Sequence, residues 1–325
     1  MSLYQFKVEV EVSRVATIKD IAQRAGVSVS TASRALNDNP RISQATRLKV
    51  KRVASELNYQ PNYNAQNLTR GESNMVGLVF PVTSDTAPAN PFHIDLMRGI
   101  SSALKPLQYE MVVAIAPNPQ ELLASVKSMV TQSKIHNFLV FYTMANDPVT
   151  AYLRKNGLNF VVIGRPTAQH HDRFVDNDNV KAGQVATEQL LTRHGAQRPL
   201  FIESGDNWTY ELARRDGYRQ CMTAHRLPAL TWAASRDTGI SQFLDHHPEV
   251  DGIVCADDIL YGRLNRDLQR YDLPTVCFNN SRLMGMLLHE SERVDLQPRE
   301  LGRAAVELLF NSRKDHQLVD FKIYD

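Results

Sequence analysis

The stretch TIKDIAQRAGVSVSTASRALNDNPRISQATRLKVKRVASELNYQPNYNAQNLT, which runs from Thr17 to Thr69, decides the fold of the first part of the chain. Thr17 can cap a helix together with Asp20, three residues later. Gly26 offers the positive φ that commonly ends a helix, and Ser28 can cap the next one. The pattern predicts a helix, a tight turn and a second helix, the helix-turn-helix arrangement whose second helix enters the DNA major groove.

The rest of this stretch contains a third helix and a short polar segment. The third helix is predicted from Ser43 to about Leu57, with one apolar and one basic side. The segment 61–69 is too short and too polar to form a stable helix alone. Residues 1–15, at the other end, form an extension to which the sequence assigns no role.

Three motifs of this stretch resemble the DNA-binding head of the lactose-repressor (LacI/GalR) family. They are A-G-V-S-x-x-T-x-S-R-x-L-N at Ala25–Asn37, I-S-x-x-T-R-x-K-V at Ile42–Val50 and L-N-Y-x-P-N at Leu57–Asn62. The resemblance implies an all-α, lambda-repressor-like head that binds DNA. The alternative is a small three-helix domain without a DNA role, which would not need the polar and basic outward face of the second helix.

The resemblance also implies which residues of the head contact DNA. Val29 and Ser30 match the pair that sets specificity, because valine can contact a thymine methyl and serine can donate or accept a hydrogen bond. The other hydroxyl and amide groups match phosphate contacts, which fix the register without reading the sequence. Helix capping or solvent exposure is the alternative for each hydroxyl. The predicted DNA-binding residues of the head are Thr17, Ser28, Val29, Ser30, Thr31, Ser33, Arg34, Asn37 and Arg41.

For residues 61–71 the resemblance implies a hinge helix that orders when two subunits meet over the DNA minor groove. Asn62, Ala65 and Gln66 match its groove-facing positions. Leu68 matches the leucine wedged into the central base step, an insertion that costs about a few kcal/mol of unstacking. A plain linker is the alternative.

After Gly71 the sequence changes to apolar strand-like runs separated by amphipathic helical stretches. This alternation predicts parallel sheets covered on both faces, in two lobes near 72–175 and 176–300. We expect crossings between the lobes near Asp176, Asn280 and Val294, with the C-terminus back beside the first lobe. The predicted strands are 75–81, 111–116, 138–142, 160–164, 200–203, 252–256 and 275–278, and the predicted helices are 92–107, 119–132, 148–156, 180–194, 210–225, 238–246, 259–271 and 298–311.

The body resembles the periplasmic-binding-protein-like regulatory domain of the same family. The predicted fold is therefore an all-α helix-turn-helix head and hinge helix, followed by an α/β two-lobed domain with parallel sheets. Within the family, F-V-V-I-G-R-P at 160–166 and V-D-N-D-N-V at 175–180 look most like the maltose-operon regulators. The predicted domains are an extension at 1–15, a DNA-binding domain at 16–60, a hinge at 61–71 and an effector-binding and dimerisation domain at 72–325.

An effector site is implied in the cleft, where ligands bind outside the carboxyl ends of the strands. Arg214, in an R-x-x-G-Y pattern, matches an arginine that holds an effector hydroxyl or carboxylate with its planar donor fork; the adjacent Arg215 is the alternative. Asp257 matches a cleft aspartate, with helix capping by Asp257 or Asp258 as the competing role. The predicted effector-binding residues are Phe92, Arg165, Arg214, Trp232, Asp257 and Asn279.

Two of these residues carry further expectations. Trp232 matches an aromatic that stacks on a sugar face, with burial in the core as the alternative. Asn279 replaces the usual aspartate of the family pattern, so the site is less acidic but still binds hydroxyls. A set of Arg, Asp, Asn and aromatic side chains favours a polyhydroxylated ligand.

The charge of the 325-residue chain is unevenly distributed. Residues 1–70 contain 11 basic and 5 acidic residues, whereas the rest contains 26 basic and 30 acidic residues. A basic head on a mildly acidic body favours nucleic-acid binding by the head. The composition, 43% apolar and 22% charged, is that of a globular protein.

The sequence indicates no catalytic residues, no metal ligands and no cofactor, and therefore no enzyme. The three cysteines, Cys221, Cys255 and Cys277, have no short metal-binding spacing and are predicted to be buried thiols, as suits a reducing cytoplasm. The pairs His170-His171 and His246-His247 are interpreted as surface residues, because adjacent residues do not share a helix face. No signal peptide and no apolar run of about 20 residues is present, which predicts a cytoplasmic protein with no membrane partner.

These features lead to one functional hypothesis with two rivals. We predict a homodimeric repressor of the LacI/GalR type that a small sugar, maltose or a related α-glucoside, releases from a pseudo-palindromic operator. The chain ends at Asp325 without a leucine heptad tail, which favours a dimer. The rivals are a corepressor-dependent repressor or activator of another carbohydrate operon and, more remotely, a sugar-binding receptor without a DNA role.

Overall fold

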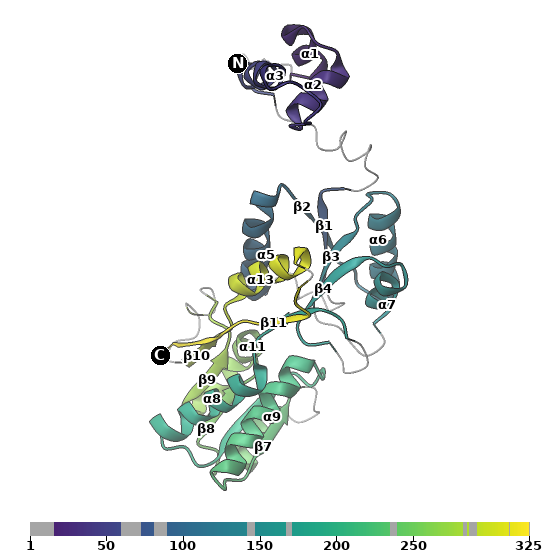
Figure 1. Cartoon of the computed structure of the whole chain (residues 1–325). Helices are drawn as coiled ribbons and strands as arrows, with labels where there is room; N and C mark the ends of the chain where they lie inside the picture. Colours follow the sequence, from purple (N-terminus) through teal and green to yellow (C-terminus); the bar gives the residue numbers. More distant parts are fainter. Residues whose placement is uncertain are drawn as a thin grey trace, which may run out of the picture. The chain divides into compact units, whose positions relative to one another are not determined.

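The structure is a computed structural model and describes residues 16–59, 73–80, 90–141, 147–166, 171–234, 239–281, 285, 291–311 and 313–324. The chain divides into two compact units, Met1–Arg70 and Gly71–Asp325 (Figure 1). The predicted extension 1–15 and the predicted hinge residues Asn62, Ala65, Gln66 and Leu68 lie outside the described residues.

The first unit contains three short helices, α1 (Ile18–Ala25), α2 (Val29–Leu36) and α3 (Gln44–Glu56). The predicted capping box is present: Thr17 Oγ1 accepts from Asp20 N, and Thr17 N donates to Asp20 Oδ2 at 2.8 Å. Gly26 ends α1 with a φ of 65°, as expected. The helices close over one small cluster of buried side chains, formed by Ile21, Ala22, Ala25, Ala32, Ala35, Val50, Val53 and Ala54.

The second unit contains two six-stranded sheets, one in each lobe. The strand order is β11-β5-β4-β3-β1-β2 in the first lobe and β12-β10-β9-β8-β6-β7 in the second. All pairs are parallel except β10 with β12, and most consecutive strands are joined by a helix. The strands are β1 (Met75–Val79), β2 (Glu110–Ala114), β3 (Asn137–Phe141), β4 (Asn159–Ile163), β5 (Phe174–Asp176), β6 (Pro199–Glu203), β7 (Leu230–Ala233), β8 (Gly252–Cys255), β9 (Thr275–Phe278), β10 (Ser291–Asp295), β11 (His316–Leu318) and β12 (Lys322–Tyr324).

Most of the connecting helices begin at an Asn or Asp that accepts a hydrogen bond from the first turn, which is why each starts where it does. Those caps are Asn90, Asn118, Asp147, Asp178 and Asp257. None of the described helices is long and apolar enough to cross a membrane. The helices are α5 (Pro91–Leu104), α6 (Pro119–Thr131), α7 (Pro148–Lys155), α8 (Asn179–Arg193), α9 (Thr209–Ala224), α10 (Ile240–His246), α11 (Asp258–Leu268) and α13 (Pro298–Phe310), with 3-10 turns at Lys105–Leu107 and Gln269–Tyr271.

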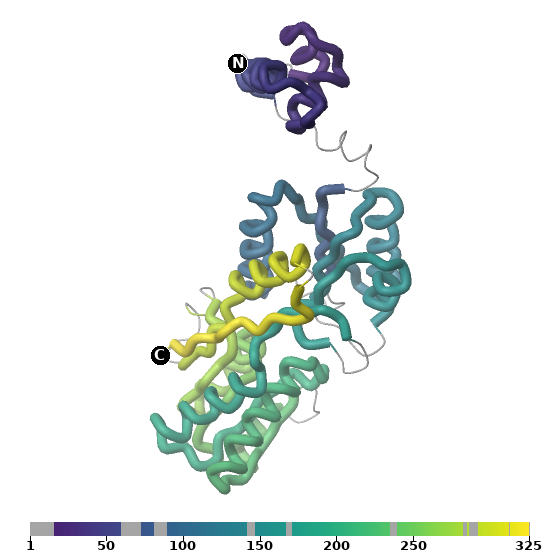
Figure 2. Tube along the Cα trace, viewed as in Figure 1, coloured from purple at the N-terminus to yellow at the C-terminus, as the bar shows by residue number. Residues whose placement is uncertain are grey.

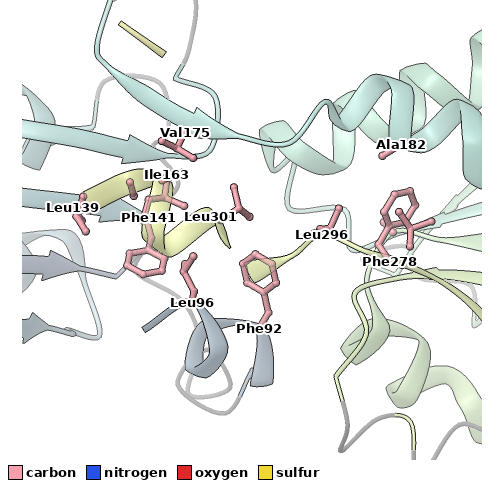
Figure 3. Close-up of a cluster of buried hydrophobic side chains, with 14 of the residues drawn as sticks. Phe92, Leu96, Leu139, Phe141, Ile163, Val175, Ala182, Phe278, Leu296 and Leu301 are labelled. Atoms are coloured by element: carbon pink, nitrogen blue, oxygen red, sulfur yellow. The ribbon is translucent and has the colours of Figure 1, made fainter. Parts of the chain in front are cut away.

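Each sheet is covered by helices on both faces. One continuous core packs α5 and α13 on the first sheet and α8 and α9 on the second. Figure 3 shows Leu296 lying between the side chains of the two lobes, with Phe92 and Leu301 on one side and Phe278 on the other. Separate clusters lie under α6 and α7 and under α10 and α11. Burial of both sheet faces explains why most strands read as unbroken apolar runs.

The chain crosses between the lobes at three places that can be followed by colour in Figure 2. The crossings follow Asp176, Asp295 and Leu318, because β5 and β11 lie in the first sheet and β10 and β12 in the second. The predicted crossing near Asn280 is wrong, since β9 and β10 are neighbours in one sheet. The predicted placement of the C-terminus is also wrong: β11 returns to the first lobe, but β12 then pairs with β10 in the second.

Candidate DNA-binding face and effector site

Helix α2 presents a polar face opposite its buried side. Ala32 and Ala35 are completely buried against the other two helices. Ser28 caps the helix: its Oγ accepts from Thr31 N at 3.1 Å and lies 2.8 Å from Thr31 Oγ1. On the outward side Val29 is 43% exposed, which is unusual for an apolar side chain and leaves its methyl groups open to a partner. The helix therefore offers an apolar contact beside hydroxyl groups at its first turn.

The remaining predicted DNA contacts lie on the surface of the same unit. Ser30, Arg34, Asn37 and Arg41 are exposed, whereas Thr31 and Ser33 are half-buried. The amide of Asn37 donates to Ser33 O at 2.9 Å, which fixes its orientation. Thr17 is exposed, but its hydroxyl donates to Asp20 Oδ2 at 2.7 Å. Thr17 thus has a clear capping role in the structure, and its DNA contact remains a prediction.

We predict that Arg34→Ala weakens binding to the specific site by about 10–100-fold and lowers the slope of log affinity against log salt by about one. The arginine is exposed on the polar face of α2 and no described acidic side chain pairs with it. Salt titrations monitored by DNA fluorescence anisotropy measure both quantities. The matched control is Arg24→Ala, because Arg24 lies 3.7 Å from Glu56 on the α1–α3 side. An equal loss in both variants would contradict the assignment of this face.

In the second unit, Arg214 lies at the centre of a buried polar cluster. The residue is 4% exposed on α9, and its guanidinium lies between two rings, 4.7 Å from Tyr210 and 4.5 Å from Phe278. Its Nε donates to Asn179 Oδ1 at 2.9 Å and its Nη1 donates to Ala256 O at 2.6 Å. Stacking and two hydrogen bonds hold the donor fork in one orientation, which suits recognition of oxygen atoms.

The carboxyl ends of β8 and β9 supply the acidic and amide groups of this cluster. Asp257 caps α11 by accepting from Ile259 N at 2.8 Å, and its other oxygen accepts from Asn279 Nδ2 at 3.0 Å. Asp258 accepts from Asn279 and, at 2.9 Å, from Ser281. Capping and a place in the cluster, which the sequence presented as alternatives for Asp257, are therefore combined in one side chain.

One acceptor of the cluster has no partner. Asn279 Oδ1 is buried without a hydrogen bond to any described residue, while the amide nitrogen of the same side chain is satisfied. The residue is 6% exposed and has a φ of 77°, a left-handed conformation that asparagine tolerates better than most residues. Buried polar atoms are nearly always hydrogen-bonded, so the orphaned oxygen indicates a site for an external donor.

A chain of hydrogen bonds joins this cluster to the crossing between the lobes. Asp176 Oδ1 accepts from Asn179 Nδ2 at 3.0 Å and its Oδ2 accepts from Arg165 N at 3.1 Å. Asn179 in turn accepts from Arg214. A cavity of about 360 Å³ opens here, within the usual size range of ligand pockets, and is lined by Arg165, Pro166, Asp176, Asn177, Asp178, Asn179, Val180, Thr209 and Ala213.

The structure does not bring two of the predicted effector residues into this site. Trp232 is 2% exposed and packs in the core under α10 and α11, as the alternative of core burial expects, and its stacking on a sugar stays a prediction. Phe92 is 7% exposed and packs in the continuous core beside His93. Arg215 pairs with Glu203 at 2.9 Å, which leaves Arg214 as the arginine of the cluster.

Sequence reasoning missed several members of the cluster. Asp176 and Asn179 lie in the V-D-N-D-N-V motif, which carried the subfamily resemblance but no assigned role. Tyr210 could have been found from its i, i+4 relation to Arg214, which places both on one helix face. Glu211 gave no signal, because nothing local predicts that its carboxyl is buried at 2% exposure against Ser204.

Burial raises the pKa of several carboxyl groups here. The pKa of Glu211 is raised to about 7, and those of Asp176 and Asp258 to about 6, with burial the main cause in each case. Burial also raises the pKa of Asp257, against the opposing effect of its helix-cap hydrogen bonds. The cluster is therefore more protonated at neutral pH than exposed carboxylates would be.

We predict that Glu211→Gln makes the stability of the second unit less dependent on pH. Between the unfolded pKa near 4.5 and the folded value of about 7, the folded chain holds a proton that the unfolded chain has released. Stability must therefore fall as pH rises through this window. As the pH rises from 5 to 8, the free energy of unfolding of the variant should increase by roughly 2 kcal/mol relative to that of the parent, since one pKa unit corresponds to about 1.4 kcal/mol. Urea unfolding at both pH values measures this, and parallel losses in the two proteins would contradict it.

Comparison with known proteins agrees with both units. Residues 17–62 match the bacterial regulatory proteins of the lacI family, and residues 73–262 match the periplasmic binding proteins and sugar binding domain of the LacI family. The regulator MalR of Staphylococcus xylosus is 32% identical over 316 residues, which cover 94% of each chain. The chain belongs to the LacI family. It is accordingly a DNA-binding transcriptional regulator with a sugar-binding domain, and not an enzyme.

Solved structures of LacI-family proteins have the same fold. A complex of the regulator CelR with cellobiose is 23% identical and covers 95% of this chain and 98% of its own, with a TM-score of 0.69. The lac repressor dimer bound to operator and an anti-inducer is 19% identical and covers 96% of this chain and 98% of its own, with a TM-score of 0.76. The predicted fold, a helix-turn-helix head followed by a two-lobed α/β domain, is confirmed.

Proposed function

We propose that this LacI-family regulator is a cytoplasmic homodimer that represses transcription from a pseudo-palindromic operator, and that maltose or a related α-glucoside releases it. The site for the sugar is the polar cluster around Arg214, Asp257 and Asn279, extended to Arg165 by the cavity at the crossing. The domain boundaries proposed are those expected from the sequence, with the DNA-binding domain at 16–60 and the hinge at 61–71.

The observation that carries the proposal is the unpartnered, buried Oδ1 of Asn279 in the same polar cluster as the oriented donor fork of Arg214. A sugar hydroxyl can donate to the first group while an adjacent hydroxyl accepts from the second. The rings of Tyr210 and Phe278 fix the guanidinium rather than leaving it to move with the ligand. Carboxyl groups with raised pKa values are partly protonated and carry little charge near neutral pH. A neutral sugar therefore suits this cluster better than a charged ligand would.

The choice of maltose rests on the relatives. The MalR proteins of Staphylococcus xylosus and of Streptococcus pneumoniae match over more than nine tenths of this chain, and both are transcriptional regulators. The motifs at 160–166 and 175–180 that look like maltose-operon regulators contribute Arg165, Asp176 and Asn179 to the proposed site. The two motifs that resemble maltose-operon regulators thus contain residues that would contact the effector.

The proposed switch uses the hydrogen-bond chain that links Arg214 to the lobe crossing through Asn179 and Asp176. A ligand that contacts both Arg214 and Arg165 would contact both lobes, because Arg165 follows β4 of the first lobe and Arg214 lies on α9 of the second. Changing the angle between the lobes in two subunits changes the spacing of their hinge segments, and therefore couples the sugar site to DNA binding. Leu68 and the groove-facing Asn62, Ala65 and Gln66 are the hinge residues proposed to respond.

A thermal-shift screen of sugars on the full chain tests the effector. Maltose at about 100 times its dissociation constant should stabilise the protein by about 2.7 kcal/mol, which corresponds to a rise in Tm of about 5–10 °C for a domain of this size. Cellobiose, glucose and galactose are the comparison sugars. If maltose and its oligomers leave Tm unchanged while another sugar raises it, the proposed effector is wrong.

A further inference from the structure

Three side chains with metal-binding chemistry converge on the surface of the second lobe, away from the polar cluster. They are Glu188 on α8, Cys221 in the last turn of α9, and His225, the residue that follows the end of α9. Glu188 Oε2 lies 2.8 Å from His225 Nε2 and 3.3 Å from Cys221 Sγ. The three potential ligand atoms all lie within 4.8 Å of one another. No other such group of three occurs among the described residues.

The fold explains why these side chains meet. His225 follows α9 directly, and its N–H still donates to Cys221 O, so it lies one turn beyond Cys221 on the same side of the helix. The two helices run so close together that a Cβ on Gly217 would lie 1.9 Å from Val180 O and 2.8 Å from Gln184 N. Glu188 and Cys221 each lie four residues, about one turn, beyond the contact of Gln184 with Gly217. The backbone contact between α8 and α9 thus fixes the distance between Glu188 and Cys221 on the next turn.

We propose that Glu188, Cys221 and His225 form a zinc-binding site that clamps α8 to α9. Thiolate, imidazole and carboxylate are the three side-chain types that bind Zn²⁺, at about 2.3, 2.0 and 2.1 Å. Tetrahedral geometry at these bond lengths separates the ligand atoms by about 3.4–3.6 Å. The two separations that involve Glu188, 2.8 and 3.3 Å, lie just below those values, and the third is at most 4.8 Å, so side-chain rotations can bring the three atoms to a tetrahedral arrangement.

The surroundings favour a metal over a reactive thiol. Cys221 is 7% exposed, so its sulfur is shielded from oxidants and other thiols. Oxidation or disulfide exchange is therefore not the natural use of this cysteine. The side chains of Glu188 and His225 are 44% and 42% exposed, which gives an ion a path to the site and leaves a fourth position for water. Zinc binding displaces the thiol proton.

The position of the site gives zinc a structural role. The first turn of α8 carries Asn179 and the second turn of α9 carries Arg214, which are hydrogen-bonded to each other in the polar cluster. A zinc clamp between the same two helices restrains the scaffold that holds this pair. No local sequence pattern indicates the site, since Glu188 and Cys221 are 33 residues apart and the interpretation of the cysteines considered only short spacings.

Zinc titration of the full chain against a chromophoric chelator tests the proposal. We expect one tightly bound Zn²⁺ per chain and a higher Tm in its presence. His225→Gln should lower the affinity at least about 100-fold, the upper end of what losing an outer-shell partner costs. This histidine is exposed, so the variant should fold. His246→Gln is the matched control: His246 is an exposed histidine on α10 of the same lobe that bonds to Gln242 O of its own helix.

Cobalt provides a second readout that a general loss of stability would not change. With Co²⁺ in place of zinc, the parent should show a thiolate-to-cobalt charge-transfer band, which Cys221→Ser should abolish. The same zinc affinity in the parent and in His225→Gln, or a cobalt spectrum without that band, would overturn the proposal. Because neither measurement involves sugar or DNA, its failure would be independent of the proposed function.

Discussion

Replacing Arg214 with methionine should produce a protein that binds operator DNA but no longer responds to sugar. The substitution removes donors to Asn179 and Ala256 and to any bound hydroxyl. A hydrogen bond to a charged group contributes about 1.5–3 kcal/mol, so the dissociation constant of the sugar should rise by about 100-fold. Isothermal titration with the effector and anisotropy of labelled operator measure the two activities separately.

The same change should also lower stability, because the charge of Arg214 favours the ionised forms of two buried carboxyl groups. Its charge opposes the raised pKa values of Asp257 and Asp176. Removing one partner of a buried charge pair typically costs about 3 kcal/mol or more. The matched control is Arg219→Met, an exposed arginine on the same helix. If the Arg214→Met protein binds the sugar as tightly as the parent does, Arg214 is not part of the effector site.

Gly217→Ala should be the most damaging single methyl addition in the second unit. The new Cβ would lie 1.9 Å from Val180 O and 2.9 Å from Val180 C, and backbone cannot move aside as a flexible side chain can. Helices α8 and α9 would have to separate, which would open the continuous core and misplace Asn179 relative to Arg214. Overpacking typically lowers the free energy of unfolding by about 1–3 kcal/mol and occasionally by more. We expect a clash with backbone atoms to lie at the upper end of that range.

We expect a net loss of about 3 kcal/mol, after allowing for the better helix propensity of alanine. For a unit of this size that lowers Tm by about 6–12 °C. Gly239→Ala is the control, because no atom of the described residues lies within 4 Å of the added Cβ and the residue caps α10 at a φ of −60°, which alanine adopts freely. Equal Tm values for the two variants would show that the helices are not in backbone contact as described.

The elements that the sequence predicted well are those with strong local patterns. The head helices were found because Thr17, Gly26 and Ser28 mark their ends, and the central strands because both faces are buried. Strands β5, β7, β10, β11 and β12 were missed, and β5, β11 and β12 have only three residues each, too few to show a period. β11 and β12 have no buried position, so neither hydrophobic period nor run length identifies them. Their pairing is set by distant contacts, and this is why the C-terminus was placed in the wrong lobe.

The candidate site was predicted unevenly for a similar reason. Asp257 and Asn279 come just after β8 and β9, and Arg214 donates to Ala256 O at the end of β8. The alternation of strands and helices in the sequence already predicts where these strands end. Trp232 lies on a strand too, but whether an aromatic residue faces the cleft or the core depends on register, and β7 was not recognised as a strand. The raised pKa of Glu211 and the unpartnered Asn279 Oδ1 depend on burial by several elements together. No local pattern contains that information.

The proposed function depends on one coupling, in which a sugar bound by Arg214 and Asn279 would control how tightly the head holds DNA. The most direct test is an operator-binding titration of the full chain, by fluorescence anisotropy, at increasing maltose concentration. The account predicts that operator affinity falls by at least about tenfold as the sugar saturates, a coupling of about 1.4 kcal/mol. It also predicts no such fall in Arg214→Met. Operator affinity that stays constant while calorimetry shows the sugar to be bound would contradict it.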